Sequence, residues 1–351
     1  MTLEDLGYHH DIEAMGIAHK LQGFETGRIM AEHKERYIVG TACGECEAAI
    51  TGNMRFTAAS REDFPAVGDW VALTTYESGN ALIHHVYPRS SVLRRQLPGS
   101  PGEAQIIAAN IDIALLVQAA GRDFNINRLE RYLTICHSSG VRPLIVLSKT
   151  DLCDRQRINE IRDALLARVR DVPVIPLSNA TGEGIDDLLA LIEKGKTHCL
   201  LGSSGVGKSS LLNRLAGQNI MKTGDISQTT QKGKHVTSHR ELIILGNGAI
   251  LIDNPGMREI GLTDEASGLE TTFDNIIRLS VHCRYSDCSH TSETGCAVTS
   301  AVEKGEISPQ AYDNFLKMQR ETAHYEATSA QKRQKDKSLS KLIKHYKRFD
   351  P

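Results

Sequence analysis

The stretch Gly202-Ser203-Ser204-Gly205-Val206-Gly207-Lys208-Ser209 fits the phosphate-binding loop pattern G-x-x-x-x-G-K-[ST]. The mostly apolar run 198–201 before it predicts a buried strand, and residues 210–215 predict the first turns of a helix that ends near Gly217. A glycine-rich turn between a strand and a helix surrounds an anion with backbone N–H groups and the positive end of the helix dipole. These flanks predict a nucleoside triphosphate site rather than a glycine-rich turn that merely mimics the pattern.

Each part of this loop has an expected role. Lys208 should reach the β- and γ-phosphates, which makes it a candidate catalytic residue, and the Ser209 hydroxyl should hold Mg²⁺. The other residues expected to contact the nucleotide here are Gly202, Ser203, Ser204, Gly205, Val206, Gly207 and Ser210.

Two further stretches concern the base, and both precede the phosphate loop. The apolar run 144–147 predicts a buried parallel strand and leads to Ser148-Lys149-Thr150-Asp151, which resembles the [NT]-K-x-D guanine motif of GTPases. That motif implies that the Asp151 carboxylate accepts hydrogen bonds from guanine N1 and N2, which adenine cannot donate. The run 174–177 leads to Ser178-Asn179-Ala180, which resembles the S-A-x loop that meets guanine O6. Ser148 stands where Asn is usual, and Asn179 where Ala is usual.

The order of these loops is unusual. A typical GTPase runs from the phosphate loop through two switch segments to the base loops, whereas here the base loops come first. All of these loops lie at the carboxyl ends of parallel strands, so rotating the chain order leaves the site intact. The sequence therefore predicts a circularly permuted GTPase domain.

Both expected switches follow the phosphate loop. The polar segment 223–239 is typical of a mobile switch I, and its Lys234-His235-Val236-Thr237 resembles a K/R-H-T-T element in which Thr237 binds Mg²⁺. A predicted hairpin with an Asn-Gly turn ends in Asp253-Asn254-Pro255-Gly256, the D-x-P-G pattern of switch II. Asp253 should hold Mg²⁺ through water, and the Gly256 N–H should meet the γ-phosphate.

The position after this pattern bears on hydrolysis. Many GTPases place a water-orienting glutamine there, but this chain has Met257, whose thioether cannot orient water. Hydrolysis without a partner should therefore be slow. His235 is the nearby titratable group that could substitute, and a solvated loop histidine is the alternative interpretation.

Composition limits the remaining possibilities. The chain has 351 residues, a net charge of −2 and no apolar run near the ~20 residues that span a bilayer, which predicts a cytoplasmic protein without a membrane partner. Three of its eight cysteines lie in Cys283-x4-Cys288-x-His290-x5-Cys296. Three thiolates and an imidazole predict one closed, structural zinc site per chain.

The predicted architecture is α/β with three domains. After a leader (1–24), short alternating runs over 25–95 predict a β-barrel of the oligonucleotide-binding (OB) type. Residues 88–105 are expected to be a linker, 105–272 the GTPase domain, and 273–351 a mainly helical zinc-binding domain. Its basic tail (332–348) is expected to meet phosphate.

A barrel, a permuted GTPase and this Cys/His module together resemble the ribosome small-subunit-dependent GTPase family (RsgA, also called YjeQ). The resemblance covers nearly the whole chain from Gly27 to about Tyr325. It implies a bacterial cytoplasmic GTPase that acts late in maturation of the 30S subunit, binds 16S rRNA and is stimulated by the ribosome to hydrolyse GTP to GDP and phosphate. We also expect the chain to be a monomer.

Two other functions are alternatives to this one. In the first, the chain is a zinc-stabilised RNA-binding protein whose binding is gated by guanine nucleotide, with incidental hydrolysis. The second, an ATP-dependent kinase or transporter ATPase, is disfavoured by the 148–151 loop and the lack of membrane signatures.

Overall fold

The structure is a computed structural model, and its chain forms two compact units that are described separately. These are residues 1–93 with 106–259, and residues 94–105 with 260–351. The structure describes residues 1–33, 36–76, 79–96, 104–121, 123–217, 241–253 and 266–346.

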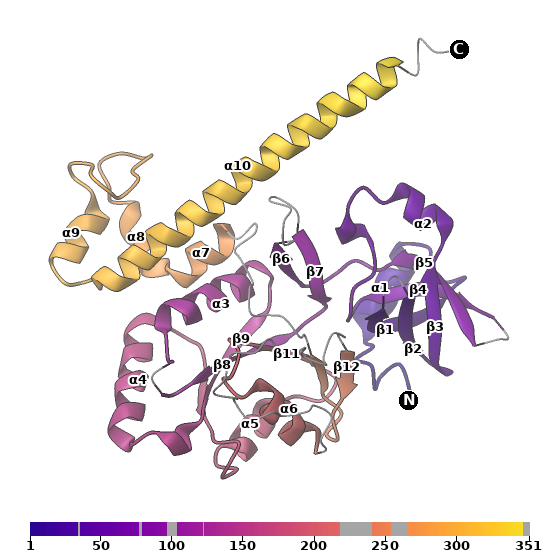
Figure 1. The fold of residues 1–351 in the computed structure, drawn as a ribbon, viewed down its shortest axis with the longest axis horizontal. Helices are drawn as coiled ribbons and strands as arrows, with labels where there is room; N and C mark the ends of the chain where they lie inside the picture. The colour runs from indigo at the N-terminus through magenta and orange to yellow at the C-terminus, as the bar shows by residue number, and fades with distance from the viewer. Residues whose placement is uncertain are drawn as a thin grey trace, which may run out of the picture. The chain divides into compact units, whose positions relative to one another are not determined.

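The centre of the first unit is a mostly parallel sheet (Figure 1). Its described strands are β8 (Ile113–Ala119), β9 (Arg142–Ser148), β10 (Val174–Pro176), β11 (Thr197–Leu201), β12 (Glu241–Ile244) and β13 (Ile250–Asp253). They lie in the order β10-β9-β8-β11-β13-β12, and only β12 is antiparallel to its neighbour here. The strand that leads into the phosphate loop, β11, is thus internal to the sheet although it comes fourth along the chain.

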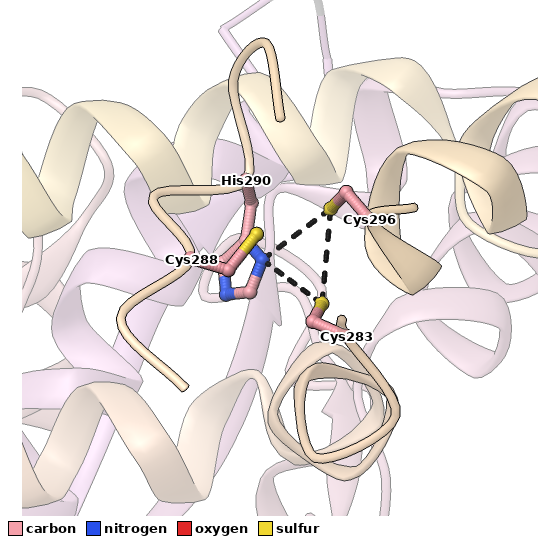
Figure 2. A group of neighbouring side chains, drawn as sticks. All are labelled: Cys283, Cys288, His290 and Cys296. Atoms are coloured by element: carbon pink, nitrogen blue, oxygen red, sulfur yellow. Dashed lines mark hydrogen bonds between the residues drawn. The ribbon is translucent and has the colours of Figure 1, made fainter. Parts of the chain in front are cut away.

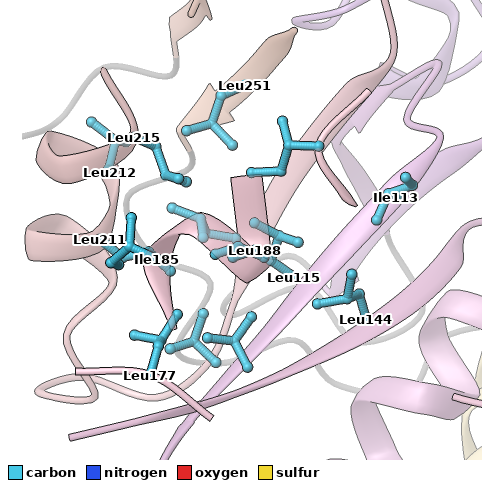
Figure 3. Close-up of a cluster of buried hydrophobic side chains, with 14 of the residues drawn as sticks. Ile113, Leu115, Leu144, Leu177, Ile185, Leu188, Leu211, Leu212, Leu215 and Leu251 are labelled. Atoms are coloured by element: carbon cyan, nitrogen blue, oxygen red, sulfur yellow. The ribbon is translucent and has the colours of Figure 1, made fainter. Parts of the chain in front are cut away.

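Helices cover both faces of this sheet, as expected for a doubly wound fold (Figure 1). On one face lie α5 (Ile185–Leu191) and α6 (Lys208–Ala216), and α3 (Ile126–Ser138) packs on β8 and β9. The helix after β9 is α4 (Arg155–Arg168). Figure 3 shows the core beneath α5 and α6, where alternate residues of the strands meet leucines of the two helices. This buried layer fixes the strand ends that carry the loops.

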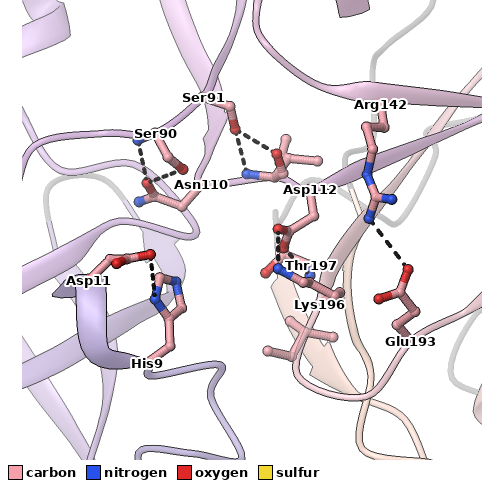
Figure 4. Close-up of polar contacts among 12 residues, drawn as sticks. His9, Asp11, Ser90, Ser91, Asn110, Asp112, Arg142, Glu193, Lys196 and Thr197 are labelled. Atoms are coloured by element: carbon pink, nitrogen blue, oxygen red, sulfur yellow. Dashed lines mark hydrogen bonds and ion pairs between the residues drawn. The ribbon is translucent and has the colours of Figure 1, made fainter.

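Side chains at the other end of the strands align β8 with β11. The Asp112 carboxylate accepts hydrogen bonds from the Thr197 backbone N–H at 2.8 Å and from Lys196 Nζ at 3.1 Å (Figure 4). The alignment holds the start of the phosphate-loop strand in register with its neighbour.

The N-terminal part of the same unit is a closed five-stranded barrel. Its strands are β1 (Glu25–His33), β2 (Arg36–Thr41), β3 (Gly44–Ile50), β4 (Trp70–Thr75) and β5 (Asn80–Val86). They pair in the order β1-β2-β3-β5-β4, and β4 returns to β1, which confirms the predicted OB-type barrel. Between β3 and β4 lie a short helix, α2 (Gly52–Thr57), and a 3-10 turn (Arg61–Asp63).

The barrel is joined to the central sheet. Ala31 of β1 pairs with Glu241 of β12, and the buried Arg28 side chain crosses the junction. Its guanidinium donates hydrogen bonds to carbonyls of Leu6 (2.5 Å), Gly68 (3.2 Å) and Asn110 (3.2 Å), and to the Thr197 hydroxyl (2.9 Å). Burial lowers the pKa of Arg28 to about 10, so the group stays charged at neutral pH.

Two segments that were expected to lie between or before the domains, the leader and the linker, contain regular structure. The expected leader contains α1 (His10–Ala18), and its Leu6 and Ile12 are buried. The expected linker contains β6 (Val92–Gln96) and the start of β7 (Ala104–Ala109), which pair with each other. A buried Leu93 anchors β6, so this segment is not the irregular connection that its Pro and Arg residues suggested.

The second unit is mainly helical, as predicted. It contains α7 (Ala266–Thr272), α8 (Asp274–Ser280), α9 (Ala297–Glu303) and α10 (Pro309–Tyr346). The rings of Phe273 and Phe315 pack edge to face with centroids 5.5 Å apart, which joins α8 to α10. Residues 332–346 of the basic tail fall in the C-terminal part of α10. Within the described residues, no helix combines the length and the apolar character needed to cross a membrane.

Candidate nucleotide and metal sites

The phosphate loop has the predicted surroundings, with β11 before it and α6 beginning at Lys208. The Lys208 ammonium lies across the loop and donates to the carbonyls of Gly202 (2.6 Å) and Ser203 (2.7 Å). A Cβ at Gly202 would stand 2.3 Å from the Val117 carbonyl oxygen of β8, so the close approach of these strand ends requires glycine. The loop therefore has the form that presents N–H groups to a phosphate.

The two base loops contact each other. The Ser178 hydroxyl donates to the Asp151 carboxylate at 2.5 Å and accepts the Ala180 N–H at 3.2 Å. The Thr150 N–H donates to the Leu177 carbonyl at 3.3 Å. The Asp151 carboxylate is exposed and oriented, as a group that accepts hydrogen bonds from a base should be.

Ser148 and Asn179, the two residues that depart from the usual guanine motifs, connect the base loops to the phosphate loop. The buried Ser148 hydroxyl donates to the Val206 carbonyl at 2.6 Å. The Asn179 amide donates to the Gly207 carbonyl at 3.1 Å. Serine and asparagine therefore make a structural connection at these positions that the motif comparison did not reveal.

The predicted switch residues His235, Thr237 and Gly256 lie outside the described residues. Asp253, the predicted Mg²⁺ residue of switch II, ends β13, which is the parallel neighbour of β11. Its position at the carboxyl end of that strand places it at the same edge of the sheet as the phosphate loop.

In the second unit, the four predicted zinc ligands come together (Figure 2). The ligand atoms of Cys283, Cys288, His290 and Cys296 lie within 4.8 Å of one another. Cys283 Sγ and Cys296 Sγ are 3.8 Å apart, and each is 3.5 Å from His290 Nδ1. Tetrahedral zinc with bonds of about 2.3 Å separates two sulfurs by roughly 3.8 Å, so the cluster fits the ion.

Neighbouring groups hold the cluster in shape. Glu293 accepts hydrogen bonds from the backbone N–H groups of Ser289 (2.8 Å) and Thr291 (3.0 Å), which flank His290. The hydrogen bond from the Ser289 hydroxyl, together with these backbone hydrogen bonds, lowers the pKa of Glu293 to about 2. The Tyr312 hydroxyl of α10 donates to the His290 carbonyl. Such outer contacts fix the orientation of metal ligands.

Cys296 is also the N-cap residue of α9, and its sulfur accepts a hydrogen bond from the Thr299 backbone N–H. Burial alone would raise its pKa, but hydrogen bonds from Thr299 and His290 outweigh this effect and lower the pKa to about 6. A thiolate is the form that binds metal. Burial raises the pKa of the neighbouring Cys288 thiol to about 11, so the spacing of the four ligand atoms, and not the titration of one thiol, is what indicates the metal site.

Comparison with known proteins decides the family. A family model described as RsgA GTPase matches residues 86–263. "Small ribosomal subunit biogenesis GTPase RsgA 2" from Lactiplantibacillus plantarum is 41% identical over 94% of this chain and 93% of that protein. The chain belongs to the RsgA GTPase family. RsgA 1 from Listeria innocua is also 41% identical, over 100% of this chain and 99% of that protein. The predicted GTP-hydrolysing activity is thereby confirmed at the level of the family.

Solved structures from this family agree with the fold. YjeQ from Thermotoga maritima superposes with a TM-score of 0.63 at 26% identity, covering 85% of this chain and 98% of that one. YloQ, described as a circularly permuted GTPase, gives a TM-score of 0.61 at 26% identity, covering 87% and 97%. The predicted circular permutation of the GTPase domain is confirmed.

A second family model, described as ABC transporter, matches residues 185–343. This match includes the phosphate loop, which many classes of nucleotide-hydrolysing protein share. Across the described part of the chain no membrane-crossing helix accompanies it. The RsgA relatives match 94% and 100% of the chain, whereas the ABC transporter model matches only residues 185–343, so the family assignment rests on the RsgA relatives.

Proposed function

We propose that this chain binds the small (30S) ribosomal subunit, contacts its 16S rRNA and acts late in its maturation, with the subunit stimulating GTP hydrolysis. The observation that carries the proposal is the similarity along the whole chain to proteins named for small ribosomal subunit biogenesis. A shared GTPase domain alone would support only nucleotide hydrolysis, whereas here the similarity extends over 94% and 100% of the chain in the two relatives.

For the nucleotide, we propose that Asp151 and Lys149 recognise guanine and that the phosphate loop binds the β- and γ-phosphates. The oriented Asp151 carboxylate and the Lys208 ammonium at the loop support these roles. Mg²⁺ would be held by Ser209, Thr237 and Asp253, and it would neutralise phosphate charge during hydrolysis. We expect Gly256 to contact the γ-phosphate.

For the second unit, we propose one structural zinc ion bound by the four ligands shown in Figure 2. Because all four coordination positions are filled by protein, the ion would stabilise the fold rather than activate water. The basic C-terminal part of α10 would then provide positive charge near the RNA. We also propose that the chain acts as a cytoplasmic monomer.

The test is GTP turnover by the full chain with and without purified 30S subunits. The proposed function expects slow hydrolysis alone and a large increase with 30S. A complex with 30S that depends on GTP, but without faster hydrolysis, would instead support the RNA-binding function with incidental hydrolysis.

A further inference from the structure

An arginine from outside every nucleotide motif reaches the phosphate loop. Arg128 lies in the first turn of α3, the helix that follows β8. Its Nη1 donates a hydrogen bond of 2.9 Å to the Ser203 hydroxyl. Ser203 is the second residue of the phosphate loop, 75 positions further along the chain.

This contact lies beside the lysine that is expected to meet the β- and γ-phosphates. The Lys208 ammonium, the group that meets the β- and γ-phosphates in such loops, donates to the Ser203 carbonyl at 2.7 Å. The guanidinium and the ammonium therefore converge on one residue. Two cations brought together in this way favour an anion between them.

The position of Arg128 is fixed by its helix. Its backbone N–H donates to the Asn125 side chain, and Gln118 of β8 bonds to the Asn125 backbone in both directions. Two residues later, buried Glu130 forms a two-point ion pair with Arg168 of α4 at 2.6 and 2.8 Å. Arg168 thus neutralises the nearby carboxylate of α3. Arg128 itself has no carboxylate partner among the described residues.

We infer that Arg128 is a γ-phosphate contact supplied by the chain itself, which distinguishes GTP from GDP. In the structure its guanidinium rests on Ser203, and with GTP bound it donates to an oxygen of the terminal phosphate. Arginine at this position suits a phosphate because its planar fork donates two hydrogen bonds at once. The inference rests on the GTPase activity of the family and not on any ribosomal partner.

The test compares Arg128→Ala and Arg128→Lys with wild type in direct binding of two fluorescent nucleotides, GDP and a non-hydrolysable GTP analogue. Loss of a charge-assisted contact should weaken the analogue by about 10- to 100-fold in Arg128→Ala. GDP, which lacks the terminal phosphate, should change by less than about threefold. Arg128→Lys keeps the charge without the fork, so its loss for the analogue should be intermediate.

Arg162→Ala is the matched control, because it removes an exposed arginine from α4 of the same domain. It should bind both nucleotides as wild type does. Equal weakening of GDP and analogue in Arg128→Ala would show that Arg128 only shapes the loop, and this would overturn the inference, as would no change for either nucleotide. If wild type itself binds no guanine nucleotide, the GTPase assignment fails instead.

Discussion

At the scale of single residues, the site depends on substitutions that a motif comparison treats as imperfections. Ser148 and Asn179 depart from the usual guanine motifs, and each donates a hydrogen bond to a carbonyl of the phosphate loop. The sequence motifs located both residues but could not show what they contact, because the partners Val206 and Gly207 lie on a different strand end. Arg128 was missed because nothing in the local sequence of α3 points to a loop 75 positions away.

Asp151 gives a direct test of base recognition. Asp151→Asn should weaken GTP by about 2–3 kcal/mol, roughly 30- to 150-fold, because a carboxylate that accepts two hydrogen bonds is replaced by a mispaired amide. Binding of xanthosine triphosphate should improve relative to GTP. Asp163→Asn, an exposed carboxylate of α4, is the control in a nucleotide titration. Unchanged GTP affinity in Asp151→Asn would refute the assignment.

His198 gives a prediction about pH. Its Nδ1 donates to backbone carbonyls of Lys196 and Ile250, while its buried Nε2 has no hydrogen-bond partner among the described residues. Burial lowers its pKa from 6.5, so the unfolded chain binds the proton more readily than the folded one. Stability should therefore be full above about pH 6.5 and decrease as the pH falls below it.

The measurement is urea unfolding at about pH 7.5 and pH 5.5. His198→Asn retains a donor near the Nδ1 position and removes the titrating ring, so its stability should depend less steeply on pH than that of wild type. Identical pH dependence in the two proteins would exclude His198 as a contributor. Burial also lowers the pKa of His137, so part of the wild-type dependence should remain in the variant.

At the scale of elements, apolar runs bounded by turns were sufficient to predict the strands that carry the loops. The runs 144–147, 174–177 and 198–201 all lie in or overlap strands of the sheet. The pairing of strands that are distant in the sequence could not be predicted from such apolar runs. Neither the β6–β7 pair nor the contact of β1 with β12 follows from the hydropathy of one strand, because each depends on which edges remain open once the sheet is assembled.

The Cys/His loop is the element whose stability should depend most on an ion. The four ligands lie in a segment with few buried apolar side chains, so removing zinc should unfold it while guanine nucleotide binding in the other unit remains. Cys288→Ser should lose the stoichiometric zinc that wild type carries, as measured by atomic emission. Cys43→Ser, which alters an exposed thiol of the barrel, should keep it. Freshly purified wild type without one zinc per chain would contradict the prediction.

At the scale of the whole molecule, the ribosome-coupled function makes a kinetic prediction. Met257 cannot orient water, so we expect His235 to do so once 30S fixes switch I. His235→Ala should keep GTP affinity and 30S binding but lose most of the 30S-stimulated hydrolysis, a loss on the order of 10²-fold for a group that positions or activates water. Single-turnover hydrolysis at saturating 30S measures this effect. His239→Ala, at the end of the same segment, is the control, and a His235→Ala protein stimulated as strongly as wild type would exclude this role.

The buried Arg28 has a consequence for how the molecule can be divided. Its guanidinium donates hydrogen bonds to acceptors in the N-terminal segment, in the barrel and in the GTPase sheet. The same group lies 5.2 Å from the centroid of the Trp70 ring. Separating the barrel from the sheet would leave a desolvated charge without part of its acceptors, which is costly. The two parts should therefore melt in one cooperative transition, and a truncated barrel should be a poor substitute for the intact protein.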